Sequence, residues 1–136
     1  MLNKIAHHLD FYQRSLGLRA AKAEVIASNI ANADTPGYKA VDFDFGKALK
    51  SQTAAQQARG VALAKTDNRH MAAMGSRAVE GGLQHRSAVQ RSLDGNTVDM
   101  DVERSAFTDN AMKYQSTLTF LNKRISGLME AIKGGQ

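Results

Sequence analysis

The side chains best suited to metal binding and proton transfer are four histidines, His7, His8, His70 and His85. His7 and His8 are neighbours in a segment of helical periodicity, so their side chains point about 100° apart and do not face one metal ion. A zinc site needs three or four converging ligands, and the chain has no cysteine to supply them. We interpret the histidines as solvated or interfacial and predict no metal site.

The acidic residues between Asp94 and Glu103 superficially resemble a calcium-binding loop. They lack the glycine at position six and the glutamate at position twelve that such a loop requires. Turn and helix-cap chemistry explains these acids instead. The chain also has no Gly-x-Ser-x-Gly motif, phosphate loop or dinucleotide fingerprint. We therefore predict a protein that is not an enzyme and that binds no cofactor.

Charge and hydropathy exclude further classes of function. The net charge is +5, from 18 Lys and Arg against 13 Asp and Glu, and the basic residues are scattered instead of gathered on one stripe. We therefore expect no nucleic-acid partner. No stretch approaches the roughly 20 apolar residues of a membrane span, so we expect no direct membrane insertion. The first residues also lack the apolar run of a cleaved signal peptide.

The most informative pattern is an apolar repeat at each end of the chain, whose steps alternate between three and four residues. Such a repeat is typical of helices that pack lengthwise. Each repeat has one polar break, Arg19 in the first and Arg104 in the second. The predicted packing residues are Leu2, Ile5, Leu9, Tyr12, Leu16, Ile26 and Ile30 in the first repeat, and Phe107, Tyr114, Leu118, Leu121, Ile125, Leu128 and Ile132 in the second. Packing on each other as an antiparallel hairpin and packing on other molecules are both open.

These repeats predict a mainly α-helical single domain, residues 1–136, in which two long terminal helices form a coiled-coil-like pair. The N-terminal helix covers residues 1–33, the C-terminal helix covers residues 99–136, and residues 34–98 form a loop-rich middle. Pro36 ends the first helix because a proline disfavours the helical conformation of the residue before it. Asp99 is a good N-cap for the second helix, with acids in its first turn, and Gly134 is a usual stop.

Within the middle, Thr35 to Tyr38 fits a type II turn in which Gly37 takes a positive φ. Residues 41–45 alternate apolar and acidic side chains, which predicts a short extended segment. Residues 46–59 have a helical composition, whereas residues 60–91 look like a surface excursion or a flexible stretch. Residues 94–96 are a turn, suited to the tip of a small hairpin.

Two blocks of sequence carry a resemblance to a known family. The first block resembles the signature near the N-terminus of bacterial flagellar axial proteins, which form the rod and hook. It consists of Ser28, Asn29, Ile30, Ala31, Asn32, Thr35, Pro36, Gly37 and Tyr38. The second block is similar to the proximal rod proteins of the flagellar basal-body rod family. It includes Leu93, Asp94, Gly95, Asn96, Val98 and Asp99.

The resemblance implies a structural subunit of the proximal rod, which assembles helically and helps to transmit torque from the membrane ring to the distal rod and hook. It implies export by the flagellar type III apparatus without a cleaved signal, a place in the periplasmic rod, and terminal helices that order on assembly. The implied partners are copies of the chain itself, rod proteins of the FlgC and FlgF type, the rod-base adaptor FliE and the membrane (MS) ring protein. In this context Asn29 and Asn32 can bond backbone groups where the helix ends, and Pro36 with Gly37 fixes the exit of the chain.

Three alternatives stand beside this interpretation. The neighbouring rod protein FlgC shares the first block, but the second block argues against it. A small helical adaptor or export chaperone would also use long apolar stripes, and it would be a folded, soluble monomer or dimer. A basic helical hairpin that binds nucleic acid would show steep salt-dependent retention on DNA.

Overall fold

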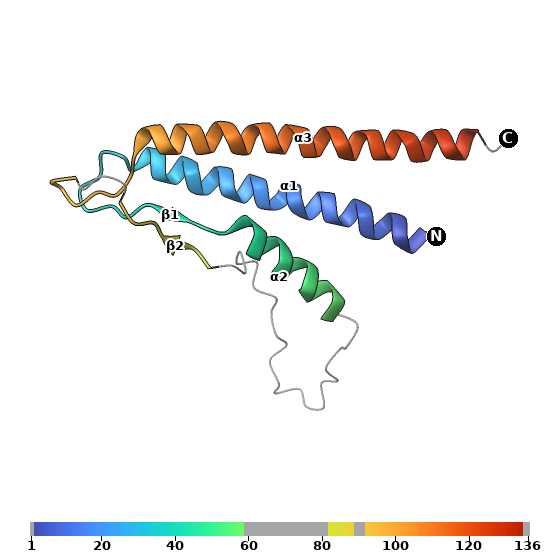
Figure 1. Cartoon of the computed structure of the whole chain (residues 1–136), viewed down its shortest axis with the longest axis horizontal. Helices are drawn as coiled ribbons and strands as arrows, with labels where there is room; N and C mark the ends of the chain where they lie inside the picture. Colours follow the sequence, from blue (N-terminus) through green and yellow to red (C-terminus); the bar gives the residue numbers. More distant parts are fainter. Residues whose placement is uncertain (1, 59–81, 89–91, 135–136) are drawn as a thin grey trace, which may run out of the picture.

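A computed structural model describes residues 2–58, 82–88 and 92–134, with side chains from Leu9 to Ala54 in the first of these ranges. The elements in chain order are α1 (Leu2–Ala31), β1 (Val41–Asp42), α2 (Phe45–Ala58), β2 (Gln84–His85) and α3 (Met100–Lys133). The two long helices run along each other, and the shorter α2 lies against the other side of α1 (Figure 1). The described part of the chain is therefore mainly helical, as predicted.

α1 and α3 are antiparallel, with the end of α1 beside the start of α3. Two contacts fix the register: Asn29 Nδ2 donates to Glu103 Oε2 at 3.3 Å, and Asn110 Nδ2 donates to the carbonyl of Arg19 at 2.9 Å. In Figure 1 the helices are closest near this shared end and separate toward their free ends. The exposure of Met129 and Ile132, near the free end of α3, agrees with this separation.

The ends of α3 follow the prediction from local sequence. Asp99 has an extended backbone, and its carboxylate accepts hydrogen bonds from the backbone N–H groups of Asp101 and Val102 at 3.0 and 3.3 Å. These are donors that the first turn of a helix leaves without an internal partner. At the other end, the N–H of Gly134 donates to the carbonyl of Glu130 at 2.7 Å. α1 ends at Ala31, two residues before the predicted boundary, and a turn follows.

A small apolar core lies between α1, β1 and α2. Its buried members are Leu18, Phe43 and Ala48, with Ala21, Val25, Phe45 and Leu49 packed around them. The Arg19 guanidinium lies 4.3 Å from the centre of the Phe45 ring. The predicted extended segment over residues 41–45 was too long, because Asp44 accepts a hydrogen bond from the N–H of Lys47 at 3.0 Å and so starts α2 at Phe45.

The second strand was missed by the sequence analysis. Val41 pairs with His85 and Asp42 with Gln84 in a two-stranded antiparallel sheet, so residues 84–85 belong to the folded part and not to a surface excursion. Residues 59–81 and 89–91 of that predicted excursion lie outside the described residues. The turn at residues 94–96 is present, with Gly95 at φ 77°, but it does not join the two strands of this sheet and so is not its hairpin tip.

The apolar repeat of α3 does not make most of the contact with α1. The buried residues of α3 are Glu103 and Asn110, and half-buried Ala106 and Thr117 continue the same stripe. The predicted packing residues Phe107, Tyr114, Ile125 and Ile132 are exposed, whereas Leu118, Leu121 and Leu128 are half-buried. The contact stripe is displaced by about one residue around the helix, because polar side chains of α3 bond to α1. Of the two alternatives that the sequence left open, packing within one chain does not apply to these four exposed residues, and packing on other molecules stays a prediction for them.

The predicted packing residues of α1 are better covered. Ile26 is buried, and Leu9, Tyr12, Leu16 and Ile30 are half-buried. The side chains of Leu2 and Ile5 lie outside the described residues. The predicted hairpin of helices is therefore present, but it leaves an apolar stripe of α3 in contact with solvent.

Candidate functional site

The two sequence blocks meet where α1 ends and α3 begins. We call this region the signature junction and define it as residues 28–41, 86 and 92–103. The chain passes through it three times outside the helices, and backbone hydrogen bonds join these passes. The N–H of Gly37 donates to the carbonyl of Asp94 at 2.9 Å, and the N–H of Thr97 donates to the carbonyl of Tyr38 at 3.0 Å. The N–H of Arg86 donates to the carbonyl of Ala40 at 2.8 Å.

Asn29 attaches the extended segment to the last turns of α1. Its side chain is almost fully buried, with 1 % of the residue surface exposed. Its Oδ1 accepts from the N–H of Val41 at 3.0 Å, and its Nδ2 donates to the carbonyl of Val41 at 2.8 Å. The amide thus pairs with both backbone groups of one residue, as a neighbouring strand would. The predicted bonding of Asn29 to the backbone is confirmed, with its partner 12 residues along the chain.

Asn96 caps the C-terminal end of α1 from the other block. Its Nδ2 lies within hydrogen-bonding distance of the carbonyls of Asn32, Ala33 and Thr35, at 3.0, 2.8 and 2.9 Å. These carbonyls lie in the turn that follows α1 and outside its internal hydrogen bonds, so the buried Asn96 amide supplies donors to acceptors that the helix leaves unpaired. Asn96 Oδ1 in turn accepts from the N–H of Val98 at 2.7 Å. Sequence analysis identified Asn96 only as a turn residue.

The predicted turn after α1 is present and is stacked on the second turn. The N–H of Tyr38 donates to the carbonyl of Thr35 at 3.2 Å, and Gly37 has φ 73°, as a type II turn requires. Lys39 Nζ donates to the carbonyl of Gly95 at 2.6 Å, which ties the two turns together. Asn32 bonds locally, since its Nδ2 donates to the carbonyl of Ser28 at 2.8 Å.

An ion pair between a buried carboxylate and a half-buried arginine lies beneath the junction. Glu103 is fully buried, and its carboxylate accepts from the guanidinium of Arg86 and from the Asn29 amide. A buried carboxylate is costly unless it is paired and hydrogen-bonded, so these two partners keep the charge of Glu103 tolerable. Sequence analysis placed Glu103 in the first turn of α3 but did not identify this role. No local pattern marks Arg86 as its partner, because the two residues are 17 positions apart.

Some of the remaining residues of the two blocks are half-buried, and others are exposed. Ser28 Oγ and Tyr38 Oη lie 3.4 Å apart, and Ile30 and Val98 are half-buried. Ala31 and Pro36 are exposed, and Leu93 is fully exposed. The blocks therefore build the junction, and they also place one large apolar side chain in solvent beside it.

Two carboxyl groups in the turns have lowered pKa values. A hydrogen bond from the Ser92 side chain, followed by one from the N–H of Asn96, lowers the pKa of Asp94. A hydrogen bond from the N–H of Lys47 is the main cause of the lowered pKa of Asp44. Burial lowers the pKa of Arg19 at the contact of α1 with α2 and α3. Hydrogen bonds or burial explain all three shifts. Asp94 therefore stabilises a turn, Asp44 stabilises the start of α2, and Arg19 packs between helices.

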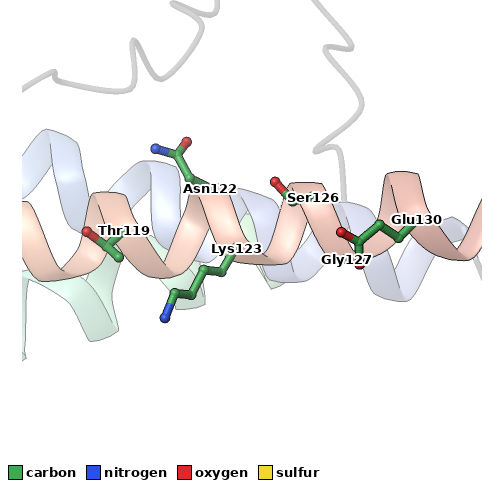
Figure 2. Close-up of a pocket in the computed structure, with 6 residues that line it drawn as sticks. All are labelled: Thr119, Asn122, Lys123, Ser126, Gly127 and Glu130. Carbon is green, nitrogen blue, oxygen red and sulfur yellow. The ribbon is translucent and has the colours of Figure 1, made fainter.

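No three His, Asp or Glu side chains of the described ranges come together as metal ligands. One shallow depression is lined by Thr119, Asn122, Lys123, Ser126, Gly127 and Glu130, and Figure 2 shows these residues spread along α3 alone. Their side chains do not converge on one point, so the depression is helix surface and not a binding site. None of the described helices is both long enough and apolar enough to span a membrane.

Comparison with known proteins decides the family. Residues 10–39 match the family described as "Flagella basal body rod protein". The flagellar basal body rod protein FlgB of Salmonella typhimurium is 45 % identical over 137 residues, which cover 99 % of each chain. FlgB of Escherichia coli K12 is 46 % identical over 137 residues with the same coverage, and FlgB of Aeromonas hydrophila is 46 % identical over 92 % of each chain. The chain belongs to the FlgB family of flagellar basal body rod proteins.

The match to FlgB extends beyond the two blocks from which the resemblance was inferred. An alignment that covers 99 % of both chains includes residues 46–91, which lie outside both blocks. The family match at residues 10–39 contains most of α1 and the first block of the signature junction. The relatives are named as flagellar basal body rod proteins, and these names describe parts of an assembly and not enzymes. The FlgC and adaptor alternatives are therefore not favoured.

Proposed function

We propose that the chain is a structural subunit of the proximal rod of the flagellar basal body, and that it assembles helically through α1 and α3. Family membership over the whole length supports a structural rod subunit in the basal body. A proximal position would allow the subunit to help transmit torque from the membrane ring to the distal rod and hook.

The exposed stripe on α3 is the observation that carries this proposal. We define the outer stripe of α3 as Phe107, Ala111, Tyr114, Leu118, Ile125, Met129 and Ile132, of which Leu118 is half-buried and the others are exposed. Phe107 is 45 % exposed, Tyr114 38 % and Ile132 77 %. The stripe runs for about 38 Å along the helix at 1.5 Å per residue. Apolar surface of this length is typical of a contact with other molecules, so it supports assembly along the helices.

The signature junction supplies the rigid end of such a subunit. Asn29 and Asn96 hold the chain that leaves α1 and the chain that enters α3, and the Glu103 ion pair ties α3 to the segment after β2. A subunit that transmits torque needs a fixed angle between its long helices and the loops that leave them. The buried hydrogen bonds of the junction favour one such angle, because breaking any of them leaves a buried polar group unpaired.

The partners in this proposal are copies of the chain, rod proteins of the FlgC and FlgF type, the adaptor FliE and the MS ring protein. Export by the flagellar type III apparatus, without a cleaved signal peptide, would bring the chain to the periplasmic rod. The absence of cysteine suits an oxidising compartment, since a free thiol would be a liability there.

Complementation and electron microscopy test the proposal together. In a host strain that lacks this gene, expression of the chain should restore swimming and complete basal bodies. A map of basal bodies isolated from that strain should show the α1–α3 pair at the membrane-proximal end of the rod. A strain that swims without the chain, or a map with the chain elsewhere, would contradict the proposal.

A further inference from the structure

The outer surface of α1 complements the outer stripe of α3 in size. We define the outer face of α1 as its exposed residues with alternating steps of four and three, namely Gln13, Gly17, Ala20, Glu24, Ala27 and Ala31. Four of these six residues are Gly or Ala, and a Cβ atom added at Gly17 would meet nothing within 4 Å. The outer stripe of α3 instead presents the large rings of Phe107 and Tyr114. Large side chains of one helix pack closely against small ones of another.

The two surfaces also complement each other in charge. Glu24 is the one charged residue of the outer face of α1, and within the described ranges it has no ion-pair partner. Arg104 precedes Phe107 by three residues and has a side chain that is 69 % exposed. Its only ion-pair partner in the described ranges is Asp101, at the long distance of 4.0 Å. An exposed cation therefore lies beside the stripe and an exposed anion lies within the face.

The spacings fit one antiparallel register. If Arg104 lies opposite Glu24, the next positions along α3 are Phe107, Ala111 and Tyr114, with steps of three, four and three. Going backwards along α1 from Glu24, the steps are four, three and four. Phe107 then lies opposite Ala20, Ala111 opposite Gly17, and Tyr114 opposite Gln13. Steps that alternate between three and four residues on both helices are typical of the successive packing layers in an antiparallel pair of helices. Each ring then lies opposite a smaller side chain.

This contact cannot form within one chain, because α1 uses another face to contact its own α3. Arg19, Ile26 and Asn29 lie on that inner face, and Arg19 and Asn29 bond to Asn110 and Glu103. We propose that the outer stripe of α3 in one copy binds the outer face of α1 in a second copy, antiparallel, with Arg104 paired to Glu24. This inference rests on the proposed function, since it assigns residues to the contact between copies in the rod.

Disulfide cross-linking between two copies tests the register. The chain has no cysteine, so Phe107→Cys and Ala20→Cys can be expressed as separate full-length copies in the host strain that lacks the gene. Isolated basal bodies should contain a disulfide-linked dimer of the two variants. A matched control pairs Ala20→Cys with Lys113→Cys, since Lys113 is exposed on α3 outside the outer stripe. The control should give at least about tenfold less dimer, because the proposed contact holds only the first pair in register.

Charge reversal tests the pairing of Arg104 with Glu24. Glu24→Arg alone and Arg104→Glu alone should each lower the yield of the cross-linked dimer by about tenfold, because like charges then face each other. The double variant should recover most of the yield. A double variant no better than the single ones would overturn the inference, as would basal bodies without the dimer. A disulfide from Phe107→Cys to a cysteine of a different rod protein would also overturn the inference and would assign the stripe to that neighbour. If the unmodified chain failed to restore basal bodies, the proposed function itself would fail.

Discussion

Asn29 and Asn96 each satisfy several backbone groups at the signature junction, and each does so from a buried position. An amide side chain carries two N–H donors and one carbonyl acceptor with two lone pairs. It can therefore join a segment with an unpaired carbonyl to a segment with an unpaired N–H group. Asn29 pairs with a donor and an acceptor of Val41, whereas Asn96 donates to the end of α1 and accepts from Val98. These residues therefore hold three separate segments together, which an apolar side chain of equal size would not do.

Replacing Asn96 tests this role. Asn96→Ala should lower the free energy of unfolding by about 1–3 kcal/mol, because the carbonyls of Asn32, Ala33 and Thr35 lose a buried donor. Asn96→Asp should be worse, since a carboxylate oxygen would then face those carbonyls. Thermal unfolding followed by circular dichroism measures both variants. Asn122→Ala on the exposed surface of α3 is the control and should change stability by about 0.5 kcal/mol or less.

The buried ion pair makes a second prediction at this scale. Arg86→Met should destabilise the protein by about 3–5 kcal/mol, because it leaves the Glu103 carboxylate buried and unpaired. The additional change Glu103→Leu removes that charge, so the double variant should be more stable than Arg86→Met alone. Chemical denaturation of the three proteins gives the comparison. A double variant less stable than Arg86→Met would show that Glu103 stabilises the fold without Arg86.

The turn carboxylates predict how stability changes with pH. Hydrogen bonds lower the pKa of Asp94 in the folded chain below its ordinary value of 3.8, so its contribution is present above that value and is lost as the pH falls through the folded pKa. The free energy of unfolding should therefore decrease as the pH is lowered below about 4, and Asp94→Asn should weaken this decrease. Carboxyl ¹³C NMR titration measures the pKa directly. An Asp94 pKa above 3.8 in the folded protein would contradict this prediction.

At the scale of elements, the helices could be predicted from the sequence because their boundaries are set locally. Asp99 caps α3 with its own side chain, and the turn that contains Pro36 and Gly37 keeps the chain from continuing α1 as a longer helix. The strand β2 could not be predicted, since Gln84 and His85 are polar and their partners lie more than 40 residues away. A strand of two residues has no periodicity to detect.

The rotation of α3 was not predictable for a different reason. An apolar repeat shows that a helix has a packing face, but it does not show whether the partner is in the same chain. The rotation is fixed by Glu103 and Asn110, whose partners on α1 are Asn29 and Arg19. Polar residues at such positions look like solvent-facing residues in the sequence, so the repeat alone did not show which residues of α3 face α1. The two asparagine roles were partly predictable, because the blocks indicated a helix end but not what bonded to it.

The exposed stripe of α3 gives a prediction that separates folding from assembly. Phe107→Asp should lower the stability of the isolated chain by only about 1 kcal/mol, because Phe107 is 45 % exposed there and loses only part of its apolar contact. The same change should abolish swimming, since the carboxylate would be desolvated in a contact between subunits. Lys123→Ala, also exposed on α3, is the control and should swim normally. Normal swimming by Phe107→Asp would remove the outer stripe from the assembly contact.

At the scale of the whole molecule, polar contacts are concentrated at one end. The signature junction joins α1, α3 and both strands through buried hydrogen bonds, whereas the free halves of the long helices expose large apolar side chains such as Met129 and Ile132. Local stability follows the density of buried contacts, so the molecule should not open uniformly. A subunit of this kind would have a folded end before assembly and would order its free ends against its neighbours, where the entropy cost of about 1–2 kcal/mol per residue is offset by new contacts.

Amide hydrogen exchange measures this gradient. In the isolated chain at micromolar concentration, residues 26–31 and 99–110 should exchange slowly, because the junction covers them, whereas residues 9–14 and 122–133 should be close to unprotected. In assembled basal bodies both of the latter ranges should become protected, since other subunits then cover the outer stripe of α3. Asn29→Leu should remove the gradient, because it breaks both bonds to Val41 and the contact with Glu103. Uniform strong protection of the monomer along α1 and α3 would instead show that the helix pair is stable alone, and the free ends would then need no partner to order them.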